Sequence, residues 1–182
     1  MSNPEAGYAS AIGASRTVTY TYDREGHLAG AVKSGTTVTY QYDVAGRRIA
    51  KNINGTMTNY VYSGFDLIEE RDNSNNVLAT CVYAGGIDNP VKVIKESDVY
   101  YFQQDALGNV TALVDENGAI FESYSYDVFG KLEIKDATGD PVANPATPFL
   151  FTGREYDAET GLYHYRARSY SPELGRFQPD SI

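Results

Sequence analysis

A tyrosine motif recurs every twenty residues in the first third of the chain. Tyr22-Asp23, Tyr42-Asp43 and Tyr62-Ser63 follow one another at this spacing, and each of these tyrosines closes a Tyr-x-Tyr triplet. A fixed period of this length is typical of one supersecondary unit that is stacked many times along the chain. The period therefore restricts the fold to a repeat array.

The series weakens after residue 63 but continues. Tyr83, Phe102, Tyr126 and Phe151 follow at spacings of 21, 19, 24 and 25 residues, so that seven or eight copies fit the chain. An Asp-x-x-Gly motif follows the aromatic residues in four copies, at Asp23 to Gly26, Asp43 to Gly46, Asp105 to Gly108 and Asp127 to Gly130.

Each copy predicts a β-hairpin. Residues 17–22 and 36–42 are rich in threonine, valine and tyrosine, which favour pleated, half-buried strands. In the Asp-x-x-Gly motif the aspartate can accept bonds from backbone amides just ahead of it, and the glycine adopts a positive φ, so the motif predicts a tight turn. The returning strand ends at a second turn, as at 34–35, 54–55 or 117–118.

The predicted fold is all-β, with antiparallel hairpins joined into a curved or spiral sheet. The two rings of each Tyr-x-Tyr triplet lie on the same face of a strand because side chains alternate. A single hairpin buries too little apolar surface to be stable, so neighbouring copies must stack through these rings. The predicted structural residues of the array and of the segment that follows it are Tyr20, Tyr22, Asp23, Gly26, Tyr40, Tyr42, Asp43, Gly46, Tyr60, Tyr62, Asp105, Gly108, Tyr124, Tyr126, Asp127, Gly130, Gly161, Tyr163, Tyr165, Arg166, Arg168, Gly175 and Arg176.

The repeats resemble a known family. The segments 20–28, 40–48 and 124–132 are similar to the YD repeat of Rhs proteins, wall-associated toxins, the C subunits of insecticidal toxin complexes, and teneurins. Residues 149–177 resemble the start of the Rhs-associated core. The resemblance covers about residues 16–182 and implies a segment of a hollow β-shell that spirals around a cargo, usually a C-terminal toxin domain. It also implies a bacterial protein that is held in the cytoplasm before secretion or delivery to the cell exterior.

Four segments are expected on this basis. Residues 1–15 are small and polar and form a flexible lead-in, and residues 16–135 form the hairpin array. Residues 136–148 contain three prolines and a glycine, which predicts a linker loop. Residues 149–182 are the start of the core.

The sequence predicts a structural protein rather than an enzyme. Full-length members of the resembled family release their cargo by an aspartyl self-cleavage after the core, and Asp180 matches only the first aspartate of that pair. One carboxylate without its partner cannot carry out chemistry that depends on a shared proton. We therefore expect no catalytic residue, with Asp180 as half of an incomplete self-cleavage module being the alternative.

No cofactor or metal is expected either. His27 and His164 occupy ordinary repeat positions, and a metal site usually needs three or four convergent ligands. The recurring aspartates are explained by turn formation, with calcium binding as the alternative. Cys81 is the only cysteine and is expected to be a small buried hydrophobic residue.

Charge and surface patterns indicate the partners. The formal net charge of −9 argues against nucleic acid, and no apolar run is long enough to span a membrane. The expected partners are a cargo polypeptide, neighbouring shell segments, or another copy through exposed strand edges. Stacking of a glycan on the tyrosine rows is an alternative. Arg166 and Arg168 are expected to form salt bridges with an acidic group at Glu155, Asp157 or Glu159.

Overall fold

The computed structural model describes residues 18–86 and 88–178, which form two antiparallel sheets and one short 3₁₀ helix. The all-β prediction is confirmed. Asp180 and the predicted lead-in at 1–15 lie outside the described residues. The large sheet contains β1 (Val18–Tyr22), β2 (Leu28–Lys33), β3 (Thr36–Tyr42), β4 (Arg48–Ile53), β5 (Thr56–Ser63), β6 (Asp66–Arg71), β7 (Val77–Tyr83), β8 (Pro90–Lys95), β9 (Asp98–Gln104), β10 (Val110–Val114), β11 (Ile120–Tyr126) and β12 (Leu132–Asp136). The small sheet contains β13 (Glu155–Asp157), β14 (Leu162–Tyr165), β15 (Arg168–Ser171) and β16 (Arg176–Phe177), and the helix η1 is Phe151–Gly153.

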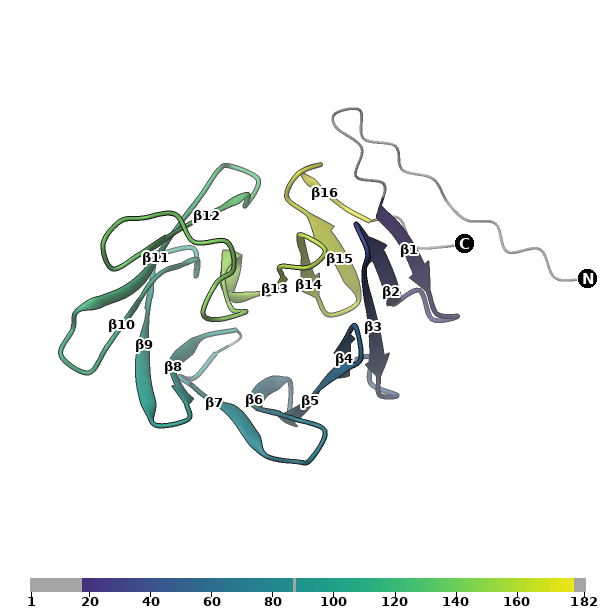
Figure 1. Ribbon diagram of the computed structural model, residues 1–182, viewed down its shortest axis with the longest axis horizontal. Helices are drawn as coiled ribbons and strands as arrows, with labels where there is room; N and C mark the ends of the chain where they lie inside the picture. The colour runs from purple at the N-terminus through teal and green to yellow at the C-terminus, as the bar shows by residue number, and fades with distance from the viewer. Residues whose placement is uncertain (1–17, 87, 179–182) are drawn as a thin grey trace, which may run out of the picture.

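The large sheet is a curved array of hairpins. Its twelve strands follow one another in chain order, and each is antiparallel to the next. Figure 1 shows that the sheet bends into an arc and that the small sheet lies in the hollow between its two ends. The prediction of a copy at Phe151 is wrong, because Phe151 lies in η1, where Thr152 and Gly153 have positive φ values of 52° and 71° that interrupt the extended backbone.

The Asp-x-x-Gly turns are closed by the aspartate side chain. Oδ1 of Asp105 accepts bonds from the backbone amides of Leu107 and Asn109, both at 2.9 Å, and Oδ2 accepts one from the Asn109 side chain at 2.7 Å. Gly108 completes the turn with a φ of 78°. The acceptor therefore reaches two and four residues ahead, further than the sequence suggested. The same carboxylate geometry recurs at Asp23, Asp43, Asp72, Asp115, Asp127 and Asp136.

This geometry explains why unlike residues follow the glycine. His27, Arg47 and Asn109 each bring a side-chain nitrogen to the second carboxylate oxygen of their own turn, at 3.1, 2.7 and 2.7 Å. His27 also stacks on the ring of Tyr42, with centroids 4.7 Å apart, and Arg47 lies over the ring of Tyr62. His27 therefore has the same structural role in its turn as Arg47 and Asn109 have in theirs, although the three residue types differ.

The predicted tyrosine rows face the hollow of the arc. Tyr40, Tyr60 and Tyr124 are buried there, and Tyr20, Tyr22, Tyr42, Tyr62 and Tyr126 are half-buried in the same two clusters. The residues between them in each strand, such as Thr39 and Gln41, are exposed on the outer face. Aromatic rings thus recur along the whole inner face.

In four hairpins the last tyrosine of the first strand is bonded to the hairpin before it. Its hydroxyl donates to the carbonyl that follows the preceding turn, which fixes the spacing of neighbouring copies. Where Gln104 replaces the tyrosine, its Nε2 makes the corresponding bond to Pro90 at 3.4 Å. The tyrosine bonds are Tyr42 to Leu28 (2.9 Å), Tyr62 to Arg48 (2.9 Å), Tyr83 to Leu67 (3.1 Å) and Tyr126 to Val110 (2.6 Å).

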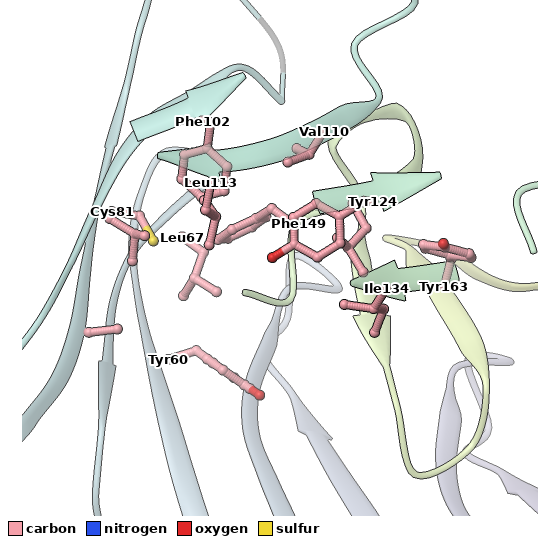
Figure 2. Packing of buried hydrophobic residues seen from close by; sticks show 13 residues of the cluster. Tyr60, Leu67, Cys81, Phe102, Val110, Leu113, Tyr124, Ile134, Phe149 and Tyr163 are labelled. Carbon is pink, nitrogen blue, oxygen red and sulfur yellow. The ribbon is translucent and has the colours of Figure 1, made fainter. Parts of the chain in front are cut away.

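A segment from the second half of the chain covers the inner face. Figure 2 shows the Phe149 ring among side chains of the large sheet, including Phe102 and Tyr124. Phe149, Leu150 and Tyr163 are 4%, 0% and 0% exposed. Burial of such side chains stabilises by roughly 1.5–3 kcal/mol each, so this contact supplies much of what holds the arc together.

Residues 137–148 connect the two sheets. The carboxylate of Glu122 accepts bonds from the Ala146 amide at 2.7 Å and from the Tyr124 hydroxyl at 2.6 Å, and Lys95 donates to the Ala146 carbonyl. Thr147 is fully buried, whereas 137–141 are exposed. The domain boundaries drawn at 135 and 149 stay predictions.

Removing one inter-hairpin hydroxyl tests the tyrosine bonds. Tyr62→Phe should lower the free energy of unfolding by about 1–2 kcal/mol, because the Arg48 carbonyl loses its donor in a largely buried position. Urea denaturation measures the change. Tyr101→Phe, at an outer-face tyrosine that is 39% exposed, is the matched control and should change stability by less than about 0.5 kcal/mol. Equal effects of the two substitutions would contradict the assignment.

Candidate functional site

One inward-facing position of the repeat differs sharply between copies. We define the turn-exit position as the residue that pairs with the last tyrosine, or its replacement, at the turn inside each hairpin of the large sheet. Arg48 holds this position in the second hairpin and is only 2% exposed. In the other hairpins the position is apolar, and its members are Leu28, Leu67, Pro90, Val110 and Leu132. Because a buried cation is costly unless it is paired, Arg48 needs an anionic partner at this otherwise apolar position.

The partners come from the small sheet. Arg48 donates from Nη1 to Oδ2 of Asp157 at 2.6 Å and from Nη2 to Oε2 of Glu155 at 2.5 Å. Its guanidinium also lies over the rings of Tyr40 and Tyr60, 5.1 and 5.5 Å from their centroids. We call Arg48, Lys51, Glu155, Asp157, Glu159 and His164 the inter-sheet charge cluster.

Lys51 extends the cluster along β4. Its Nζ lies 3.1 Å from Oδ1 of Asp157 and 3.2 Å from Oε1 of Glu159. Both oxygens of Asp157 therefore face cations, one from each of two inward positions of the same strand. The two cations thus offset most of the negative charge of the three carboxylates where the two sheets meet.

Mutual attraction overcomes the cost of burying these ions. Burial alone would raise the pKa of Asp157, but Arg48 and Lys51 lower it to about 2. Burial alone would likewise lower the pKa values of Arg48 and Lys51, but Asp157 raises both above their ordinary values. All three groups are thus ionised at neutral pH, and removal of one partner leaves an uncompensated charge.

His164 lies on β14 beside these ions. It is 8% exposed, pairs with Glu155 across the β13–β14 hairpin, and its ring centroid is 6.0 Å from that of Tyr42. Burial, reinforced by Arg48, lowers the pKa of His164 to about 4. The imidazole is therefore neutral at neutral pH and is part of the packing between the sheets.

A second ionic contact lies at the rim of the arc. Asp88 faces Arg154 at 2.8 Å and Arg166 at 2.9 Å. The prediction that Arg166 and Arg168 pair with Glu155, Asp157 or Glu159 is therefore wrong. Those carboxylates are taken by Arg48 and Lys51 from the other sheet.

The positions of the two arginines give the physical reason. Arg166 has a φ of 57° in the turn after β14, and it projects to Asp88 and over the ring of Phe65, 5.4 Å from its centroid. Arg168 is exposed and lies 4.1 Å from the centroid of Phe177. Both side chains belong to the rim and outer side of the small sheet.

The remaining predicted residues of the small sheet have packing or turn positions. The Tyr163 hydroxyl donates to the Gly130 carbonyl at 3.0 Å, and the Tyr165 hydroxyl lies 2.7 Å from that of Thr152. Gly161 and Gly175 have positive φ values of 78° and 61° in turns. Arg176 is exposed on β16.

The chemistry that this arrangement supports is ion pairing. The pocket between the charge cluster and the rim has a volume of about 40 Å³, room for little more than water, and Arg47, Tyr62, Asp88, Glu155 and His164 are among its lining residues. Across 18–86 and 88–178 no group of three or more His, Cys, Asp or Glu residues could hold a metal. Burial raises the pKa of the Cys81 thiol to about 12, so it is not a nucleophile near neutral pH. In the described part of the chain no helix could cross a membrane.

Sequence reasoning missed Arg48, although a signal was present. Alignment of the copies by their turns places Arg48 where an apolar residue stands elsewhere. The two partner carboxylates lie 107 and 109 residues further along the chain, and no local pattern points to them.

Comparison with known proteins agrees with the hairpin array. A family model described as Teneurin YD-shell matches residues 5–181, nearly the whole chain. The chain belongs to the teneurin YD-shell family. The resemblance to Rhs and YD-repeat proteins is therefore confirmed.

Individual relatives of this YD-shell chain include proteins with toxin names. It is 35% identical over 126 residues to Salivary gland surface protein 1 of Aedes aegypti, a match that covers 59% of the chain and 4% of that protein. It is 34% identical over 112 residues to tRNA nuclease WapA of Bacillus subtilis (strain 168), covering 62% and 5%. It is 32% identical over 87 residues to Toxin protein Tse5 of Pseudomonas aeruginosa, covering 48% and 6%.

A solved structure shares the fold. The crystal structure of TcdB2-TccC3 matches with a TM-score of 0.63 and 20% identity, over 88% of this chain and 9% of that chain. The YD-shell chain therefore spans only a small part of the length of every relative described above. It is a YD-shell segment related to Rhs-type toxins.

Replacing the buried arginine tests the charge cluster. Arg48→Leu installs the residue found at other turn-exit positions, but it should destabilise by about 3–5 kcal/mol because Glu155 and Asp157 stay buried without their cation. Thermal and urea unfolding measure the loss. Arg47→Leu, which removes the neighbouring and more exposed pair with Asp43, should cost only about 1 kcal/mol or less. A stable Arg48→Leu variant would refute the electrostatic account.

The low pKa of His164 predicts a loss of stability in mild acid. As pH falls from 6.5 towards 4, the unfolded chain takes up a proton at this histidine that the folded chain does not, so the folded state loses up to about 3 kcal/mol. Below that range the loss continues, because between pH 3.8 and about 2 the unfolded chain takes up a proton at Asp157 that the folded chain does not. Urea unfolding at a series of pH values should give a shallower dependence for His164→Asn between pH 6.5 and 4. Parallel curves for the two proteins would contradict the prediction.

Proposed function

We propose that this segment is a non-enzymatic part of a shell wall that encloses a polypeptide cargo. The observation that carries the proposal is the use of the concave face, which packs its tyrosine rows against another stretch of polypeptide. Residues 146–163 lie along it with Phe149, Leu150 and Tyr163 fully buried. A face that covers an extended chain in this way suits containment.

The curvature of the wall supports the same function. Neighbouring hairpins are tied together on their inner side by the tyrosine hydroxyls, and the outer side carries exposed threonine and glutamine. A long antiparallel sheet twists and curls, and burial of its apolar inner face favours the curvature that encloses that face. In the complete protein, further hairpins of the same kind would continue the wall around the cargo.

The names of several relatives indicate the class of cargo. Tse5 is named a toxin protein and WapA a tRNA nuclease, and in each the matched stretch is about a twentieth of the length. If the matched stretch is part of a shell wall in those proteins, their toxin and nuclease activities belong to other parts of their chains. We infer a toxin domain as the cargo here.

The two alternatives receive less support. Self-cleavage by Asp180 has no structural support, since that residue lies outside the described part of the chain. Glycan stacking on the tyrosine rows would need open rings, whereas the inner-face rings pack into the two core clusters. We therefore retain the wall function alone.

Limited proteolysis of the natural full-length protein tests containment. A cargo inside an intact wall should resist protease, and Tyr60→Ala should raise its cleavage rate by at least about tenfold, because loss of a buried inner-face ring costs several kcal/mol and increases the open population. Mass spectrometry identifies the fragments. Tyr101→Ala removes an exposed outer-face ring and is the control. A cargo that protease cleaves rapidly in all three proteins is not enclosed, and that result would reject the function.

A further inference from the structure

A repeat array creates a problem of register for anything that packs on its inner face. The first three hairpins present almost the same inner surface, with Tyr20 and Tyr22, Tyr40 and Tyr42, then Tyr60 and Tyr62 in equivalent places. Apolar contact alone does not distinguish one hairpin from its neighbours, since it depends on area rather than direction. A sheet that docks there needs an additional, position-specific contact.

Several contacts of the small sheet use groups that recur in other hairpins. Tyr163 donates to the backbone carbonyl of Gly130, a glycine repeated at Gly26, Gly46 and Gly108. Leu162 packs with Leu28 and its neighbours in an ordinary apolar cluster. These contacts stabilise docking at several positions alike.

Arg48 is the exception, because its position is apolar in the other five hairpins. Glu155 and Asp157 are separated by one residue on β13, so their side chains lie on the same face of the strand. Arg48 donates a hydrogen bond to each of them. Lys51, on the same strand as Arg48, reaches the second oxygen of Asp157. A shift of the small sheet by one hairpin would place the two carboxylates against Leu28 or Leu67, where no guanidinium is available.

We propose that Arg48 is a specificity-determining residue that selects the hairpin on which the small sheet docks. Its partner is the Glu155-x-Asp157 strand, recognised as a pair of carboxylates on one strand face. The correct register pairs all three ions, and every shifted register buries two unpaired carboxylates. A single buried polar group fixes register in repetitive helical assemblies by the same discrimination.

The other ionic contacts of the small sheet contribute less to the choice of one hairpin over another. Lys131 and Glu173 are 62% and 69% exposed and Arg166 is 39% exposed, so water screens their ion pairs. Arg154 and Asp88, each 19% exposed, form a contact at the rim that is less deeply buried than the Arg48 cluster. Arg48 and Asp157 are 2% and 3% exposed. The inference concerns docking within the chain and holds whether or not the wall encloses a cargo.

The test replaces all three ions by apolar residues of similar volume. Arg48→Met, Glu155→Met and Asp157→Leu together remove both the attraction and the penalty, so the triple variant should still fold cooperatively, as apolar replacements of buried ion clusters do elsewhere. Carbodiimide joins amines and carboxylates only where they touch. The Lys131–Glu173 pair, 3.2 Å apart, therefore reports the native docking register, and mass spectrometry quantifies the cross-link.

The expected result is a folded triple variant whose Lys131–Glu173 cross-link falls by about twofold or more, since shifted registers then become comparably populated. New cross-links from Glu173 to other lysines should appear. The matched control, Glu69→Met with Arg71→Met, removes an outer-face ion pair and should leave the cross-link unchanged.

Two results would overturn the proposal. A triple variant with an undiminished cross-link would show that register does not depend on the ions, and a triple variant that fails to unfold cooperatively would show that they act in stability instead. Arg48→Leu with Leu67→Arg moves the cation by one hairpin and gives an independent reading. This double variant should lose the native cross-link, and its retention would also reject the selection role.

Discussion

The whole structure depends on covering an aromatic face that no single hairpin can bury. In four hairpins the last tyrosine of the first strand packs toward the hollow, while its hydroxyl is bonded to the preceding hairpin, as in the bond from Tyr62 to the Arg48 carbonyl. This combination satisfies the one polar atom of an otherwise apolar side chain and sets the distance between copies. The sheet curves toward its apolar inner face, because that face must be covered by other apolar side chains. In this chain residues 146–163 cover it.

The charge cluster is where the array departs from simple repetition. The small sheet could dock equally well at any of several equivalent aromatic hairpins. The Arg48 guanidinium between Tyr40 and Tyr60 marks one of them, because its carboxylate partners can pair only there. The cost of burying Arg48 is offset only when Glu155 and Asp157 arrive together. Stability and selectivity therefore come from different residues: the rings hold the sheets together, and the ions decide where they meet.

The sequence predicted the parts of the fold that local chemistry determines. Alternation of threonine and tyrosine located strands such as β1 and β3, and Asp43 with Gly46 located a turn whose carboxylate bonds to the backbone. The spacing of aromatic residues wrongly predicted a further hairpin at Phe151. It gives no sign that the backbone adopts a positive φ at Thr152. The partners of Arg48 were also missed, since attraction between buried ions depends on which distant strands meet. Arg166 was assigned to the wrong carboxylates for the same reason.

The central claim is that the segment from Phe149 to Tyr165 is a buried component of the arc, held on its inner face. Amide hydrogen exchange followed by mass spectrometry measures this directly. The account predicts that backbone amides bonded across this contact, such as those of Val110 and Thr152, exchange as slowly as amides inside β9 to β11. Exchange of the 149–165 segment within seconds, while β9 to β11 stay protected, would contradict it.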